Sequence, residues 1–152
     1  MGTAALALAA TAPSPLRAQE LVVTEVSAGA TAVFGHRGFW GPALGVARRP
    51  GGQGRLALSA AGGDYEGVLG MRLEGTAQLL LRPGDRTGVS PYAGLGLAFV
   101  GSGSRHGAGY VAALLGVEAA PGRARGWYGE LGLGGGVRLG VGWRWRRFPP
   151  WW

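Results

Sequence analysis

The chain has 152 residues, which is the size of a single domain, and it contains 32 glycines and no cysteine. The glycine content argues against long soluble helices, because each interior glycine costs about 0.5–1 kcal/mol relative to alanine, and the missing cysteines exclude disulfides. The net charge of +7 comes from arginine alone, because the chain has no lysine. Isoleucine and asparagine are also missing. A GC-rich genome therefore explains the preference for arginine better than a nucleic-acid partner does.

The first twenty residues differ from the rest of the chain. An apolar stretch from Ala4 to Ala12 is followed by two prolines and then by Leu16-Arg17-Ala18. This order is typical of a secretory signal peptide, although no Lys or Arg precedes the apolar stretch. We therefore expect residues 1–19 to be a cleaved signal peptide. The alternative is an N-terminal helix of the folded domain.

The remainder of the chain reads as eight strands. Side chains alternate between apolar and polar with the period of two that a β-strand imposes. The links between the strands carry the turn-forming residues Gly, Pro, Ser and Asp. The expected strands are 21–34, 39–47, 55–62, 68–81, 89–100, 110–120, 126–133 and 137–147, and residues 62–67 are expected to be a polar loop.

Every second link contains a Pro-Gly pair, and these pairs are spaced 33 and 38 residues apart. This spacing suits two strands of about 10–12 residues with their links, so the chain is predicted to be a series of hairpins. The other links, at 35–38, 62–67, 102–109 and 134–136, carry Gly, Ser, His and Asp. The two sets should lie at opposite ends. The Pro-Gly turns are Pro50-Gly51, Pro83-Gly84 and Pro121-Gly122.

One face of every predicted strand is almost wholly apolar. In water it would form a patch far larger than a soluble monomer tolerates, whereas lipid accepts it if the sheet closes and leaves no edge. The sequence thus predicts an all-β, eight-stranded antiparallel up-and-down transmembrane β-barrel. The residues expected to face lipid are Leu69, Met71, Leu73, Leu79, Leu95, Leu97, Phe99, Leu115, Val117, Leu139, Val141 and Trp143.

The other face carries about one charge per strand among small residues, which suits a narrow lumen. We expect these charges to fill the interior as a structural network, because eight strands leave room for little besides side chains. An ion path is the alternative. The predicted lumen charge network is Glu25, Arg72, Glu74, Glu118, Glu130 and Arg138.

The strand GMRLEGTAQLLLRP (70–83), the segment PYAGLGLAFVGSG (91–103) and the run LLGVE (114–118) resemble the small eight-stranded outer-membrane barrels of the OmpA transmembrane-domain and OmpX type. The resemblance covers roughly residues 21–148. It implies a barrel at 20–148, a short tail at 149–152, and a place in the outer membrane of a Gram-negative-type bacterium. It also implies periplasmic Pro-Gly turns, outer-membrane lipids as partners and a monomer. Phe148 departs from the pattern, because it falls on the parity of the arginines.

Ten arginines lie near the predicted Pro-Gly turns. They could form a basic collar for anionic headgroups, or they could simply solvate the turns. They are Arg48, Arg49, Arg55, Arg82, Arg86, Arg123, Arg125, Arg144, Arg146 and Arg147.

His36 and His106 are the only histidines, and Ser102 and Ser104 lie close to His106 in sequence. A serine nucleophile with a histidine base would suit a lipid-modifying barrel, but no acid is placed to orient either histidine. Two histidines without further ligands also make a weak metal site. We therefore expect no enzyme, no catalytic residue, no cofactor and no metal. The tryptophans are expected to form interfacial girdles.

The expected role is structural or envelope-stabilising, with a lumen filled by side chains. The alternatives are a narrow porin-like channel, a soluble periplasmic ligand-binding barrel of inverted polarity, and a lipid-modifying enzyme. The soluble alternative predicts buried Leu69, Leu73 and Leu79 and exposed Arg72 and Glu74.

Overall fold

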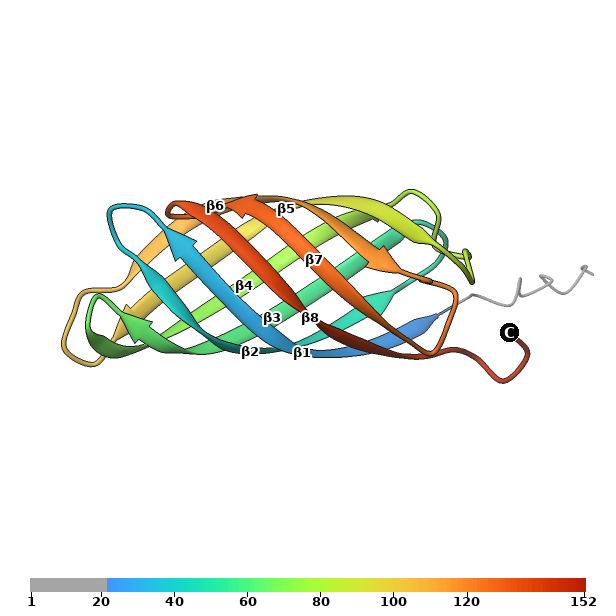
Figure 1. Cartoon of the computed structure of the whole chain (residues 1–152), viewed down its shortest axis with the longest axis horizontal. Helices are drawn as coiled ribbons and strands as arrows, with labels where there is room; N and C mark the ends of the chain where they lie inside the picture. Colours follow the sequence, from blue (N-terminus) through green and yellow to red (C-terminus); the bar gives the residue numbers. More distant parts are fainter. Residues whose placement is uncertain (1–21) are drawn as a thin grey trace, which may run out of the picture.

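The computed structural model of the chain describes residues 22–152, so the predicted signal peptide lies outside the described residues. Eight strands form a closed barrel in which each strand pairs antiparallel with its sequence neighbours and the last pairs with the first (Figure 1). The predicted eight-stranded up-and-down barrel is confirmed. The strands are β1 (Val23–Phe34), β2 (Phe39–Arg49), β3 (Gly54–Tyr65), β4 (Val68–Leu80), β5 (Val89–Ser102), β6 (Ala108–Ala119), β7 (Arg125–Leu133) and β8 (Val137–Arg147).

Residues 22–152 contain no helix that is long and apolar enough to cross a membrane.

The polar loop predicted at 62–67 is wrong, because β3 continues to Tyr65 and only Glu66 and Gly67 turn the chain into β4. Both turn residues have positive φ, 54° and 81°, as a tight two-residue hairpin requires. The glycine pair at 62–63 belongs to the strand, since Gly63 packs so close to the backbone of β2 that a Cβ would collide with it. Gly63 therefore marks a close approach of backbones rather than a loop, and Gly62 is paired with Met71 of β4 although an added Cβ there would meet nothing within 4 Å.

The register between strands fixes the width of the barrel. Following the paired residues once around the barrel from Thr24 leads to Phe34, ten positions further along β1. For eight strands this displacement gives a tilt of roughly 40° and a radius of roughly 8 Å, which admits side chains and little else. The path is Thr24, Arg48, Leu56, Ala77, Leu95, Ala113, Leu133, Val137 and Phe34.

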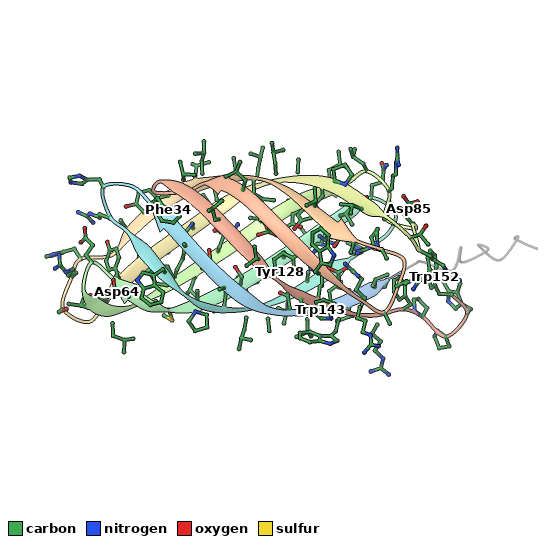
Figure 2. All side chains as sticks on the ribbon, in the orientation of Figure 1. Phe34, Asp64, Asp85, Tyr128, Trp143 and Trp152 are labelled. Atoms are coloured by element: carbon green, nitrogen blue, oxygen red, sulfur yellow. The ribbon has the colours of Figure 1, made fainter. Side chains whose placement is uncertain are left out.

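The links separate into two ends. The Pro-Gly end holds the links 50–53, 81–88 and 120–124 together with the start of β1 and the end of β8. The loop end holds the links 35–38, 66–67, 103–107 and 134–136. Figure 2 shows Asp85 and Trp152 at the Pro-Gly end and Phe34 and Asp64 at the loop end. The expected separation of the two sets of links is therefore present.

The C-terminal residues fold back onto the Pro-Gly end. The ring of Trp152 stacks on Phe148 with centroids 5.2 Å apart, and its Nε1 donates to the carbonyl of Gly122 at 3.5 Å. Arg86 of the β4–β5 link lies over the same ring, 5.9 Å from its centroid. The tail thus contacts two of the three links at this end.

Candidate functional site

The interior of the barrel is the densest concentration of polar side chains in the described part of the chain. All six charges predicted for the lumen point inward, and their side chains are at most 9% exposed. Along each strand they alternate with outward-facing apolar residues. The two-residue period of a β-strand therefore explains why these side chains point inward.

Four further arginines, Arg49, Arg55, Arg144 and Arg146, also lie inside and are buried. Both interpretations of these four arginines, as a collar for headgroups and as solvated turn residues, are therefore wrong. Strands β2, β3 and β8 extend to these residues, and their parity turns the side chains inward. The sequence pattern predicts the inward direction of two of them, because Arg144 and Arg146 share the parity of Arg138 along β8.

These arginines surround two carboxylates at the Pro-Gly end. Glu118 of β6 accepts from Arg144 Nη1 at 2.6 Å, from Arg55 Nη2 at 2.7 Å and from Arg146 Nη2 at 2.8 Å. Glu25 of β1 pairs with Arg49 Nη2 at 2.5 Å and with Arg55 Nε at 2.9 Å. We call these six residues the inner cluster: Glu25, Arg49, Arg55, Glu118, Arg144 and Arg146.

The inner cluster holds four positive and two negative charges. Main-chain carbonyl oxygens accept further hydrogen bonds from its guanidinium groups. Arg49 donates to the carbonyl of Pro83 at 3.2 Å, and Arg146 donates to the carbonyl of Arg123 at 3.3 Å. Arg144 lies between two aromatic rings, 4.4 Å from the centroid of Tyr128 and 5.6 Å from that of Tyr92. These contacts replace the water that a buried guanidinium loses.

A second group of charges lies further along the lumen and is balanced. Arg138 Nη1 donates to Glu130 at 2.8 Å, and Arg72 Nη2 donates to Glu74 at 2.9 Å. Arg138 Nε lies 3.3 Å from Glu74 and joins the two pairs. The hydroxyl of Tyr92 donates to Glu130 at 2.6 Å, and Arg144 Nη2 of the inner cluster lies 3.6 Å from Glu130, which connects the two groups. The charges therefore form one network through much of the lumen.

Apolar side chains close the lumen at the loop end. Phe39 and Tyr65 are 2% and 1% exposed, and they pack with Val33, Ala61 and Val100. Because these residues come from β1, β2, β3 and β5, the plug crosses the barrel rather than lining one wall. We call these five residues the apolar plug.

A cavity of about 50 Å³ remains between the apolar plug and the inner cluster. Small residues of β2 and β3, such as Ala43 and Ser59, form one wall, and Arg72, Glu74 and Thr76 of β4 face it. This volume is large enough for a few water molecules. It is a pocket within the lumen, bounded by the residues of the strands around it.

The outer surface has the opposite character. All twelve residues predicted to face lipid point outward and are exposed. The charged side chains on outward positions of the strands are confined to the strand ends: Arg48, Asp64, Arg125 and Arg147. Between these ends the outward positions hold Leu, Val, Ala, Met, Phe, Trp, Pro, Gly and Thr. The barrel thus carries an uninterrupted apolar belt.

Exposed aromatic residues lie toward both borders of this belt. Trp127, Trp143 and Trp145 lie toward the Pro-Gly end, and Phe34 and Trp40 lie at the loop end. Figure 2 shows Trp143 on the outside of the barrel and Tyr128 within it. Aromatic side chains at two levels are the arrangement of interfacial girdles.

The exposed charges differ between the two ends. At the Pro-Gly end, Arg48, Arg82, Arg86, Arg123, Arg125 and Arg147 are exposed, and Asp85 is half-buried. At the loop end, Arg37 and Arg105 balance Asp64 and Glu66, and Arg105 pairs with Glu66 at 3.0 Å. The exposed positive charge is therefore concentrated at the Pro-Gly end.

The histidines and serines considered as an enzyme site lie at the loop end. The hydroxyl of Ser102 accepts from the amide of Arg105 at 3.0 Å and lies 3.5 Å from the hydroxyl of Ser104. These contacts fix the β5–β6 link. Among residues 22–152, no three His, Cys, Asp or Glu side chains gather in a way that could hold a metal ion.

Solved structures share this architecture at low sequence identity. The outer membrane protein OprG of Pseudomonas aeruginosa matches with a TM-score of 0.69 and 10% identity, over 86% of this chain and 98% of that one. The N-terminal β-barrel domain of Pseudomonas aeruginosa OprF gives 0.60 and 19%, over 84% and 98%. Neisserial surface protein A gives 0.53 and 17%, over 82% and 96%.

No family model and no curated protein matches the chain. The structural matches confirm the predicted resemblance: the chain has the fold of the small eight-stranded outer-membrane barrels.

Proposed function

We propose that the protein is an outer-membrane barrel with a structural, envelope-stabilising role and a closed lumen. One observation carries this proposal: side chains block the interior at both ends. The apolar plug crosses the loop end, and the inner cluster with its four arginines crosses the Pro-Gly end. A solute path would require both to move, and the inner cluster is held by charge-assisted hydrogen bonds of 2.6–2.9 Å.

The apolar belt supports the membrane location. Leu69 and Leu79 are 83% and 54% exposed, whereas Arg72 and Glu74 are 3% and 5% exposed. A soluble ligand-binding barrel requires the reverse, so this alternative is contradicted. Strands of 9–14 residues also match the roughly 9–11 residues that a tilted strand needs to cross hydrocarbon.

The charge distribution supports the orientation with the Pro-Gly end in the periplasm. The loop end is balanced, while the Pro-Gly end carries six exposed arginines. An exported barrel inserts from the periplasm, and moving the arginine-rich end across the hydrocarbon would cost far more than moving the loop end.

The short links at the loop end support a structural role over an adhesive one. They span residues 35–38, 66–67, 103–107 and 134–136, so little surface extends beyond the belt. Binding residues are concentrated on loops, and outer-membrane barrels carry their longer loops on the outer side. A lipid-modifying enzyme is the alternative to the expected absence of catalysis, and it predicts a lipid-modifying activity that is lost in His106→Ala.

Fractionation tests the location. We expect the protein in the outer-membrane fraction, with a shift in gel mobility when the folded barrel is boiled. Recovery in the soluble fraction with no shift would contradict the membrane proposal.

Conductance tests the closed lumen. In a planar bilayer, the wild-type protein should give no current steps, with a general porin in the same bilayer as the positive control. The Arg72→Ala/Glu74→Ala double variant should be less stable but equally silent, because the apolar plug and the inner cluster remain. Regular steps from the wild type would support the narrow channel instead. Conductance gained by the double variant without a loss of stability would also contradict the structural role of the charges.

A further inference from the structure

The outer surface at the Pro-Gly end contains a hollow of about 660 Å³. It lies between the β6–β7 link and the outer faces of β7 and β8, and its lining includes Arg86, Arg123, Arg125, Trp127 and Trp143. The three arginines come from two links and the first residue of β7. We call this feature the rim pocket.

Contacts between the links fix the rim pocket in place. The amide of Gly122 donates to the carbonyl of Asp85 at 2.7 Å, and the amide of Ala120 donates to that of Gly88 at 2.9 Å. These bonds join the β6–β7 link to the β4–β5 link, which brings Arg123 near Arg86. Ala120 adopts a positive φ of 42°, so the link has a specific, constrained shape. The two links that carry Arg86 and Arg123 are thus joined by main-chain hydrogen bonds.

The chemistry of the rim pocket changes along its depth. Arg125 and Trp127 occupy successive outward positions on β7, and Trp127 pairs with Trp143 of β8. Guanidinium groups therefore lie on the aqueous side, and two indole rings lie on the side of the apolar belt. No carboxylate side chain of residues 22–152 lines the pocket. The pocket thus changes from positively charged to aromatic toward the apolar belt. A ligand that fits it has an anionic group joined directly to an apolar part.

We propose that the rim pocket binds the phosphate headgroup of an anionic glycerophospholipid in the periplasmic leaflet. Arg123 and Arg125 donate to the phosphate oxygens, which guanidinium groups recognise through paired hydrogen bonds. Trp127 and Trp143 pack against the glycerol backbone and the upper acyl chain. This inference rests on the membrane location and the orientation proposed above.

Competition between lipids tests the site in the full-length protein. Nanodiscs are prepared from phosphatidylcholine with a minor fraction of phosphatidylglycerol, and native mass spectrometry measures the phosphatidylglycerol that remains on the barrel. Quenching of tryptophan by brominated phosphatidylglycerol, compared with brominated phosphatidylcholine, gives the relative affinity. The wild type should retain phosphatidylglycerol in preference to phosphatidylcholine.

A charge-matched pair of double variants separates a site from a general attraction. Arg123→Gln/Arg125→Gln should weaken the preference about tenfold, because it removes the paired guanidinium hydrogen bonds to the phosphate and not only two surface charges. Arg48→Gln/Arg147→Gln removes the same charge from outward positions beside β1, outside the pocket. This control should change the preference less than about twofold. Equal losses in both variants, or no loss in either, would overturn the site.

Two further arms identify the ligand. Inorganic phosphate should not displace the bound phosphatidylglycerol, because it lacks the part that contacts the indole rings; displacement would reduce the pocket to a phosphate site. Lipid A should compete less well than phosphatidylglycerol, and tighter binding of lipid A would overturn the assignment to the periplasmic leaflet.

Flotation with liposomes separates the failure of this proposal from the failure of the membrane proposal. A barrel that floats with liposomes but shows no preference between the lipids contradicts the rim pocket alone. A barrel that fails to float contradicts the membrane proposal.

Discussion

Glu118 is the single residue on which the inner cluster depends most. Arg49, Arg55, Arg144 and Arg146 all lie within 3.4 Å of its carboxylate. Without it, four buried guanidinium groups would share Glu25 and a few main-chain carbonyls. A buried ion pair adds little net stability over an apolar pair, but removing one partner is expensive because the other charges stay buried.

The variant Glu118→Gln keeps the shape of the side chain and removes its charge. We expect it to lower the free energy of unfolding by about 3–5 kcal/mol, measured by urea titration of the barrel in lipid vesicles. The control is Glu66→Gln, which removes a carboxylate from an exposed pair with Arg105 and should cost less than about 1 kcal/mol. Losses of similar size in the two variants would show that the inner cluster does not hold the barrel together.

At the scale of the strands, glycines on the inner face allow neighbouring backbones to approach. Gly29 of β1 faces Gly142 of β8 in the register that closes the barrel. A Cβ on Gly29 would collide with the main chain of Val141 and Gly142, which no side-chain rotation can relieve. Part of the high glycine content is therefore explained by the curvature of a narrow barrel.

The variant Gly29→Ala should destabilise the barrel by about 1–3 kcal/mol, as overpacking does, and should lower the urea midpoint. Gly129→Ala is the matched control, because Gly129 lies in β7 with no heavy atom near the position of an added Cβ. The control should leave the midpoint unchanged or raise it, since alanine lowers the entropy of the unfolded chain. A larger loss in Gly129→Ala than in Gly29→Ala would contradict the close approach of β1 and β8.

At the scale of the whole molecule, polarity is inverted relative to a soluble protein. Charges gather in the lumen, and the apolar belt surrounds the barrel. The loss of unfolding free energy caused by a charge on the outer surface therefore depends on the depth of that charge in the membrane.

Leu95 and Thr87 provide a test of that depth dependence. Leu95 is exposed in the middle of β5, and Thr87 is exposed in the β4–β5 link at the Pro-Gly end. In lipid vesicles, Leu95→Arg should cost about 2–4 kcal/mol of unfolding free energy, whereas Thr87→Arg should cost about 0–1 kcal/mol. Urea titration in vesicles measures both. If Leu95→Arg costs no more than Thr87→Arg, the belt does not lie in hydrocarbon.

The sequence by itself determined the number of strands, the three Pro-Gly turns and the alternation of the two faces along each strand. These are local properties, because alternation follows from the geometry of a single extended strand and links follow from Pro and Gly. Local composition misleads where it suggests a turn. Arg49 precedes Pro50, but it lies in β2 with an inward parity, and the glycines at 62–63 resemble a loop but lie in β3.

Only the tertiary structure decided which side chains meet. Glu25 and Glu118 are separated by four strands in the chain, and they share arginines from β2, β3 and β8 because of the ten-residue displacement of the closed register. The rim pocket likewise depends on hydrogen bonds between the β4–β5 and β6–β7 links, which join residues more than thirty positions apart. The pattern of one strand fixes a direction for each side chain, but strand tilt and closure fix the distance between side chains of different strands.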